Sequence, residues 1–261
     1  MGTVDYRSGI AILQLIIFPI ILVAAVFIWK RTGWRVGSKI WRYAVTLSLI
    51  RIAGSISSLL LINDPTNYNI VVAVAVCQMI GIAPLLLTFI GLLRQIDVEE
   101  RLPPKLLKIV SLVAIIGLIL GIAGVSSADT DGGSYHPGTL VKVAMAIFLV
   151  VFAVFVLLSG WLFFQLSLSL RKFQKKLFLA ILISLPFLLV RLVYSALGDY
   201  TDFEAFALDG NTTVYLCMDV LEEIIAMGVT MALGISAVLE KDFVKLNPVS
   251  QEDPEQKPLG V

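Results

Sequence analysis

Five charged side chains lie inside stretches of sequence that are otherwise apolar. Three are acids, Asp219, Glu222 and Glu223, and all belong to the last apolar stretch of the chain. The other two are arginines in separate stretches, Arg51 and Arg191. If these stretches cross a membrane, the five groups lie in hydrocarbon unless they face one another or a cavity. Ionisable residues at that depth are costly, and by default they mark a functional site.

The balance of these charges indicates what the site could do. Arginine stays protonated, so two arginines can pair two carboxylates and one acid is left over. A carboxyl group without a cation in low-dielectric surroundings is expected to stay neutral. It could then donate a proton in an acid-catalysed reaction or in a proton-coupled movement, or a hydrogen bond to a ligand. Asp219, Glu222 and Glu223 are therefore the candidate catalytic acids. The opposing hypothesis is that the pairs only fix the helix register.

The elements that must position these groups are membrane helices. The chain has 261 residues, of which 58% are hydrophobic and 15% charged, and its mean hydropathy is +0.93. Soluble domains have about 25% charged residues, so the composition predicts an all-α polytopic protein with the lipid bilayer as its partner. The net charge of +1 predicts no nucleic-acid partner. Two cysteines and one histidine argue against a zinc site, and we predict neither a metal nor a cofactor.

Seven apolar runs are long enough to cross about 30 Å of hydrocarbon at a rise of about 1.5 Å per residue. They form one predicted transmembrane domain, residues 1–246, followed by a polar tail, residues 247–261, that we expect to be disordered. The predicted spans are 9–29, 40–62, 70–93, 107–127, 140–169, 177–198 and 212–239.

Basic residues favour one side of the membrane. The loops after the odd-numbered spans, together with the tail, hold nearly all of the lysines and arginines. Because positive loops stay in the cytoplasm, the N-terminus is predicted outside or lumenal and the C-terminus cytoplasmic. The sequence thus predicts an integral, multi-pass protein of the plasma membrane or an endomembrane. Asn211-Thr212-Thr213 is a glycosylation sequon in a loop on the lumenal side, which predicts a glycan on Asn211.

The polar groups of four spans share one depth. Asp219 is about 10 Å below the outer end of span 7, and Gln78 is about 12 Å below that of span 3. Residues three or four apart share a helix face, which places Tyr215 with Asp219 and Tyr194 with Arg191. Spans 2, 3, 6 and 7 are therefore predicted to enclose a polar site in the outer half of the bundle. Its predicted ligand-binding residues are Arg51, Gln78, Arg191, Tyr194 and Tyr215.

Other residues predict helix geometry rather than chemistry. Pro84 and Pro186 are expected to kink spans 3 and 6. Gly117, Gly121 and Gly124 form a small-xxx-small pattern, which favours close packing of span 4 against a neighbour.

Two short motifs resemble a known family. Arg191-Leu192-Val193-Tyr194 in span 6 is followed by Tyr215-Leu216-Cys217-Met218-Asp219 in span 7. This succession is similar to the pattern of fungal seven-helix membrane proteins of the lipid-translocating exporter (RTA-like) kind and of related uncharacterised fungal families. That pattern continues after the tyrosine with Arg and a nearby Glu, where this chain has Ser195-Ala196-Leu197. The resemblance implies a multi-pass fungal membrane protein linked to lipid or toxicant response.

Three functions fit a polar pocket in an apolar bundle, which suits a lipophilic or amphiphilic small molecule. The first is binding or translocation of that molecule. The second is an acid-catalysed cyclase or isomerase, since the chain resembles in kind the small seven-helix cyclases of fungal secondary metabolism, which protonate lipophilic substrates with buried carboxylic acids. The third is a receptor-like scaffold in which the Arg–acid pairs are structural.

Overall fold

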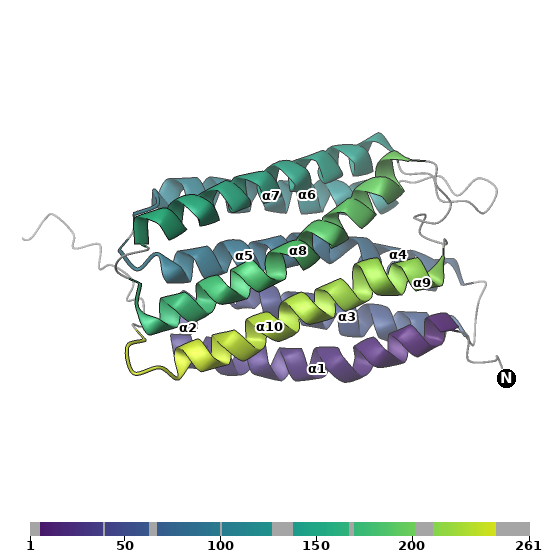
Figure 1. The fold of residues 1–261 in the computed structure, drawn as a ribbon. Coiled ribbons are helices and arrows are strands. Elements are labelled where there is room, and N and C mark those ends of the chain that lie inside the picture. The colour runs from purple at the N-terminus through teal and green to yellow at the C-terminus, as the bar shows by residue number, and fades with distance from the viewer. Residues whose placement is uncertain are drawn as a thin grey trace, which may run out of the picture.

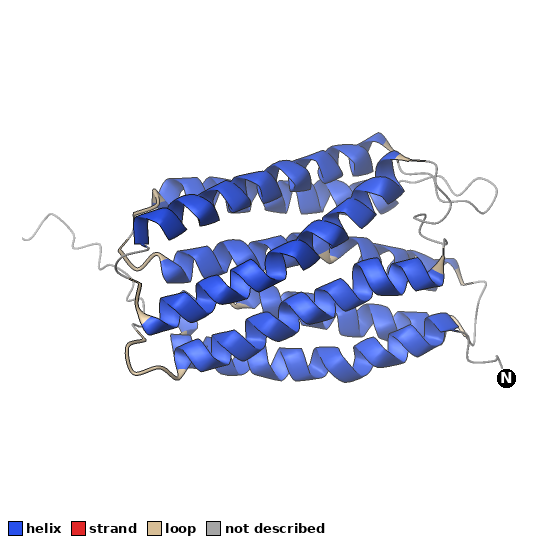
Figure 2. Ribbon diagram, in the orientation of Figure 1, coloured by secondary structure: helices blue, strands red, loops and turns tan. Residues whose placement is uncertain are grey.

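The computed structural model is a bundle of helices (Figures 1 and 2). It describes residues 6–38, 40–62, 67–99, 101–126, 138–166, 170–201 and 211–243, and none of these residues forms a strand. The predicted tail, 247–261, lies outside them. Seven helical segments are long and apolar enough to cross a membrane. They are Tyr6–Thr32, Arg42–Leu60, Asn69–Ile96, Pro104–Ser126, Thr139–Leu166, Lys172–Tyr200 and Thr212–Val238.

Five of the spans are single helices, and two are divided. The single helices are α1 (Tyr6–Thr32), α3 (Arg42–Leu60), α6 (Pro104–Ser126), α7 (Thr139–Leu166) and α8 (Lys172–Tyr200). A short helix, α2 (Trp34–Gly37), follows α1. The third span consists of α4 (Tyr68–Ile80) and α5 (Ile82–Ile96). The last consists of α9 (Thr212–Tyr215), the π-helix η3 (Leu216–Val220) and α10 (Leu221–Val238).

Large apolar side chains cover the outside of the bundle. Ile20 and Val23 of α1 are 65% and 70% exposed, and Phe164 of α7 is 81% exposed. Such a surface is unfavourable in water but is solvated by acyl chains in a bilayer. The chain is thus an integral, multi-pass membrane protein, and the prediction of an all-α fold with seven spans is confirmed. An odd number of spans also puts the start of α1 and the end of α10 at opposite ends of the bundle (Figure 1).

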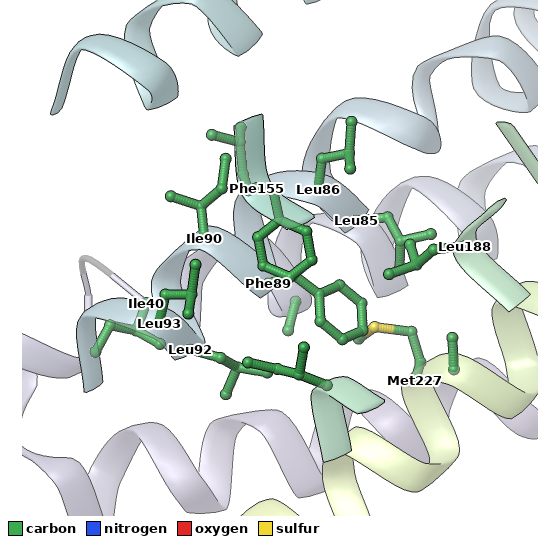
Figure 3. Close-up of a cluster of buried hydrophobic side chains, with 14 of the residues drawn as sticks. Ile40, Leu85, Leu86, Phe89, Ile90, Leu92, Leu93, Phe155, Leu188 and Met227 are labelled. Carbon is green, nitrogen blue, oxygen red and sulfur yellow. The ribbon is translucent and has the colours of Figure 1, made fainter. Parts of the chain in front are cut away.

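Helix α5 forms the centre of the apolar core. It contacts α3, α6, α7 and α8, and 14 of its 15 residues are buried. Figure 3 shows Phe89 of α5 among leucine and isoleucine side chains, with Phe155 of α7 beside it. The two rings pack edge to face with centroids 6.1 Å apart, an arrangement that aromatic pairs prefer. Packing of this kind holds helices together in lipid, where water does not drive their association.

The third span breaks at Gly81, between α4 and α5. Proline has no backbone N–H, and its ring clashes with the carbonyl group four residues earlier. For Pro84 that residue is Ile80, where α4 ends. The kink that we expected at Pro84 is therefore a break in the helix. Pro186, in contrast, lies inside the continuous helix α8.

Small residues bring α6 and α7 together. A Cβ atom added to Gly117 would lie 3.0 Å from the Phe148 ring, and one added to Gly124 would lie 2.7 Å from the Val141 side chain. These contacts confirm that the glycine pattern of span 4 serves close helix packing.

Candidate functional site

Four of the five charges within the apolar stretches form one buried ion-pair network, here called the quartet: Arg51, Arg191, Asp219 and Glu223. Arg51 donates from Nε to Glu223 Oε1 at 2.7 Å and from Nη2 to Oε2 at 2.5 Å. A paired contact of this kind is among the stronger hydrogen-bonded arrangements in proteins. Arg191 Nη1 donates to Asp219 Oδ1, and also to the backbone carbonyl of Asp219 at 3.1 Å.

Each arginine of the quartet contacts both acids. Arg51 Nη2 lies 3.5 Å from Asp219 Oδ2, and Arg191 Nη1 lies 3.2 Å from Glu223 Oε2. All four side chains are at most 5% exposed. Two positive and two negative charges cancel, which is the condition under which charges are tolerated at this depth. The four side chains come from α3, α8, η3 and α10, so the quartet links these helices.

Gly81, at the break between α4 and α5, provides the space for both arginines. A Cβ atom at this position would lie 2.5 Å from Arg51 Nη2 and 2.8 Å from Arg191 Nη2. Its φ of −56° is ordinary, so glycine is needed here for room and not for backbone conformation. We did not predict this residue from the sequence, although a glycine three residues before a proline in a membrane span was a visible signal.

The last span changes its helical geometry at Asp219. The π-helix η3 contains this residue, and the N–H of Leu221 bonds to the carbonyl of Leu216, five residues earlier. Single π-turns inside α-helices are frequent at functional sites. The quartet is thus flanked by two backbone irregularities, one in span 3 and one in span 7.

A partly open pocket lies beside the quartet and has Arg51 in its wall. It encloses about 340 Å³ of empty space, open solvent included. The wall draws on α1, α3, α4 and α9. It is lined by Arg7, Ile10, Ala11, Gln14, Arg51, Gly54, Ser55, Ser58, Cys77, Gln78 and Tyr215.

Gln14 of α1 brings an unsatisfied amide to this wall. The side chain is 6% exposed. Its Oε1 lies 3.2 Å from Ser55 Oγ, whose one proton is shared with the backbone carbonyl of Arg51 at 2.7 Å, and its Nε2 has no hydrogen-bond partner among the described residues. Several buried polar atoms of the described residues lack a partner, and Gln14 is the residue among them that lines the pocket, where a ligand or water can accept its N–H. The sequence held a signal, because Gln14 is the only amide or charged side chain between Gly9 and Trp29.

The predicted ligand-binding residues fall into two groups. Arg51, Gln78 and Tyr215 line the pocket. Arg191 belongs to the quartet and is not among the lining residues. Tyr194 is buried on α8 next to Arg191 and is also outside the lining.

The three candidate acids are also separated. Asp219 and Glu223 are held by the arginines of the quartet. Glu222 is half-buried, forms no ion pair with any described residue, and has one carboxyl oxygen, Oε2, that is buried without a hydrogen-bond partner. Glu222 is therefore the acid left over when two arginines pair two of the three. It does not line the pocket.

Asn211 lies at the end of the last span. It is exposed and caps α9, because its side chain accepts a hydrogen bond from the N–H of Thr213 at 2.9 Å. Asn is a preferred residue at this position of a helix. The cap gives Asn211 a structural role besides the predicted glycosylation.

Comparison with known proteins gives one relationship. No match was found among curated proteins or among solved structures. A family model described as "Domain of unknown function (DUF7702)" matches residues 4–241, which include all seven spans, the quartet and the pocket. The chain belongs to the DUF7702 family.

Proposed function

We propose that this protein binds a lipophilic or amphiphilic small molecule in the pocket beside the quartet. The unsatisfied Nε2 of Gln14 in the pocket wall carries the proposal. A buried N–H donor in a membrane bundle is costly unless a hydrogen-bond acceptor is bound to it. The wall combines polar side chains with a few apolar ones, such as Ile10 and Ala11, which suits a molecule with both polar and apolar parts.

Two features favour translocation in addition to binding. The break at Gly81 and the π-helix η3 both lie against the quartet. Interrupted membrane helices are typical of transporters, in which they form the substrate site near the middle of the membrane. A break and a π-turn are also places where a helix can bend while its remaining turns stay intact.

The alternative of a membrane enzyme that works by acid catalysis has less support. A catalytic acid must reach the substrate within hydrogen-bonding distance. Asp219 and Glu223 are occupied by arginines, and none of the three candidate acids is among the described residues that line the pocket. The scaffold alternative explains the quartet and the contact between Gln14 and Ser55, but it gives no reason for the unpartnered Nε2 of Gln14.

A binding measurement tests the proposal. The native chain in phosphatidylcholine nanodiscs is dialysed to equilibrium against radiolabelled octanoate, octanol and octyltrimethylammonium. We expect saturable binding of at least one probe, above that of empty nanodiscs. Ser58→Phe should abolish it, because Ser58 lines the pocket, whereas the matched variant Ser57→Phe should not, because Ser57 lies outside the lining. Binding of no probe, or equal binding by both variants, would contradict the proposal.

Translocation needs its own assay. Vesicles with and without the protein carry a phospholipid labelled with a fluorophore that dithionite quenches from outside. Faster loss of the inner-leaflet signal in the protein-containing vesicles is expected if the chain moves lipids. Unchanged kinetics would rule out movement of this lipid and leave binding in place.

We also propose that the N-terminus is outside or lumenal and that Asn211 is glycosylated. The proposal is supported by the distribution of basic residues and by the exposure of Asn211 at the start of α9. A loss of endoglycosidase-sensitive mass in Asn211→Gln is expected, with Asn69→Gln, which is exposed and not part of a sequon, as the control. A glycan-free native protein from a eukaryotic host would contradict it.

Kinship with fungal RTA-like membrane proteins is a further part of the proposal. Its support is that Arg191 and Asp219, which carry the two similar motifs, pair with each other in the quartet. A role in fungal lipid response or secondary metabolism would follow from that kinship. Genes for lipid or metabolite synthesis next to this one would support the role, and their consistent absence would count against it.

A further inference from the structure

We infer that the ligand of the pocket carries an anionic head group, a carboxylate or a phosphate, that lies against Arg51. The inference rests on the proposed binding function and names the chemical class of the ligand. Its first support is the composition of the wall. The described lining residues include two arginines, Arg7 and Arg51, and no aspartate or glutamate. The charge of Arg51 is balanced within the quartet, so the wall offers an anion N–H donors rather than a net positive charge.

The hydrogen bonds of Arg51 give the second support. Its Nε and Nη2 donate to Glu223, while its Nη1 donates to no described residue. Guanidinium groups bind carboxylate and phosphate through charge-assisted hydrogen bonds. An anion in the pocket can therefore accept a hydrogen bond from Nη1 without displacing Glu223.

The remaining polar groups of the wall are neutral. Gln14 offers an N–H without a partner, and the Tyr215 and Ser58 hydroxyl groups can donate. A cationic head group would find arginines and no carboxylate among the described lining residues, so its charge would be buried without compensation. An alcohol could accept a hydrogen bond from the same N–H groups, but without the negative charge that makes the bond from a guanidinium to a carboxylate or phosphate stronger. An anion is the head group for which the wall offers the most donors.

The test compares head groups on one tail in nanodiscs of phosphatidylcholine, which supplies no anionic lipid. We expect octanoate and octyl phosphate to bind at least about tenfold more tightly than octanol and octyltrimethylammonium, since charge-assisted hydrogen bonds are the stronger class. Acetate, which has the head without the tail, should not displace octanoate at equal concentration. Displacement by acetate would point to a site for free anions and would overturn the inference of an anionic amphiphile.

A charge-changing variant supplies the second readout. Gln14→Glu keeps the shape of the side chain and adds a negative charge to the wall. It should weaken octanoate binding by about tenfold or more and change octanol binding by less than about twofold. Gln165→Glu is the matched control, because Gln165 is exposed at the end of α7 and outside the pocket, and it should leave both unchanged.

The outcomes separate the two proposals. If octanol or the cation binds as tightly as octanoate, the anionic head group is overturned and the binding function stands. If no probe binds, the binding function fails and this inference fails with it. Should Gln14→Glu not fold, the ranking of head groups on the native protein still decides the inference.

Discussion

The two halves of the third span, α4 and α5, have opposite surroundings. Every residue of α5 except Arg94 is buried, in the apolar core around Phe89. None of the described side chains of α4 is buried, and Cys77 and Gln78 of this helix line the pocket. One apolar run of sequence thus has a structural half and a half that faces the candidate site. The change occurs at Gly81, where the quartet lies.

The largest effect is expected at the quartet, on the polar side of this comparison. Glu223→Gln removes the charge that pairs Arg51 and leaves a buried guanidinium uncompensated. Breaking a buried pair in this way costs about 3–5 kcal/mol, to be measured as the free energy of unfolding in bicelles. Glu222→Gln is the matched control and should cost less than about 0.5 kcal/mol, because Glu222 has no ion pair with any described residue. Equal losses of stability in the two variants would contradict the conclusion that Glu223 is paired by the arginines and Glu222 is the surplus acid.

A slightly smaller loss is expected in the core on α5. Phe89→Ala leaves a cavity beside Phe155 and should lower the free energy of unfolding by about 3 kcal/mol. The corresponding change on the other half, Val71→Ala, should cost less than about 0.5 kcal/mol, because Val71 is 43% exposed. Similar losses at both positions would show that the two halves contribute equally to stability.

The junction itself should be sensitive to a single methyl group. Gly81→Ala brings a Cβ atom against both arginines, and overpacking of this kind costs about 1–3 kcal/mol. Gly228→Ala is the control in the last span, since a Cβ atom there has no other atom within 4 Å. It should be neutral, or more stable by up to about 1 kcal/mol, because alanine favours helix. If Gly81→Ala is as stable as native, the arginines do not need the space.

The smallest change in stability is expected in the pocket. Gln14→Leu removes the amide whose Nε2 has no partner and loses one hydrogen bond from Ser55. These effects oppose each other, so unfolding should change by less than about 1 kcal/mol while octanoate binding is lost. A fall of several kcal/mol would assign Gln14 to the structure of the bundle instead of to its ligand.

Most of the fold could be predicted from the sequence, because the length of an apolar run is a local property. The seven spans, the helical fold and the packing of Gly117 and Gly124 follow from it. Helix ends were predicted less well. Span 6 was expected at 177–198, but α8 begins at Lys172, since a helix continues beyond its apolar part.

The site was predicted only in part, because it depends on how helices are rotated and placed. The charge count predicted two pairs and one surplus acid. It did not identify Glu222 as the surplus acid. Neighbouring residues such as Glu222 and Glu223 point in directions about 100° apart around a helix, so the rotation of span 7 decides which of the two acids faces Arg51. Three of the predicted residues line the pocket, but the part of its wall that comes from α1 was missed, because the packing of α1 against α3 is not visible in the sequence. The π-helix η3 had no sequence signal that we recognised.

The quartet also constrains the order in which the protein can mature. Arg51 and its partner Glu223 are 172 residues apart in the chain. During synthesis the second span is therefore made long before the acid that pairs with its arginine in the finished bundle. An unpaired arginine in hydrocarbon costs several kcal/mol. A chain without its last span carries two such arginines, and its insertion in the bilayer is therefore less stable. Asp219 and Glu223 supply the missing negative charges. Insertion of the last span is therefore the step at which the buried charges of the bundle become balanced.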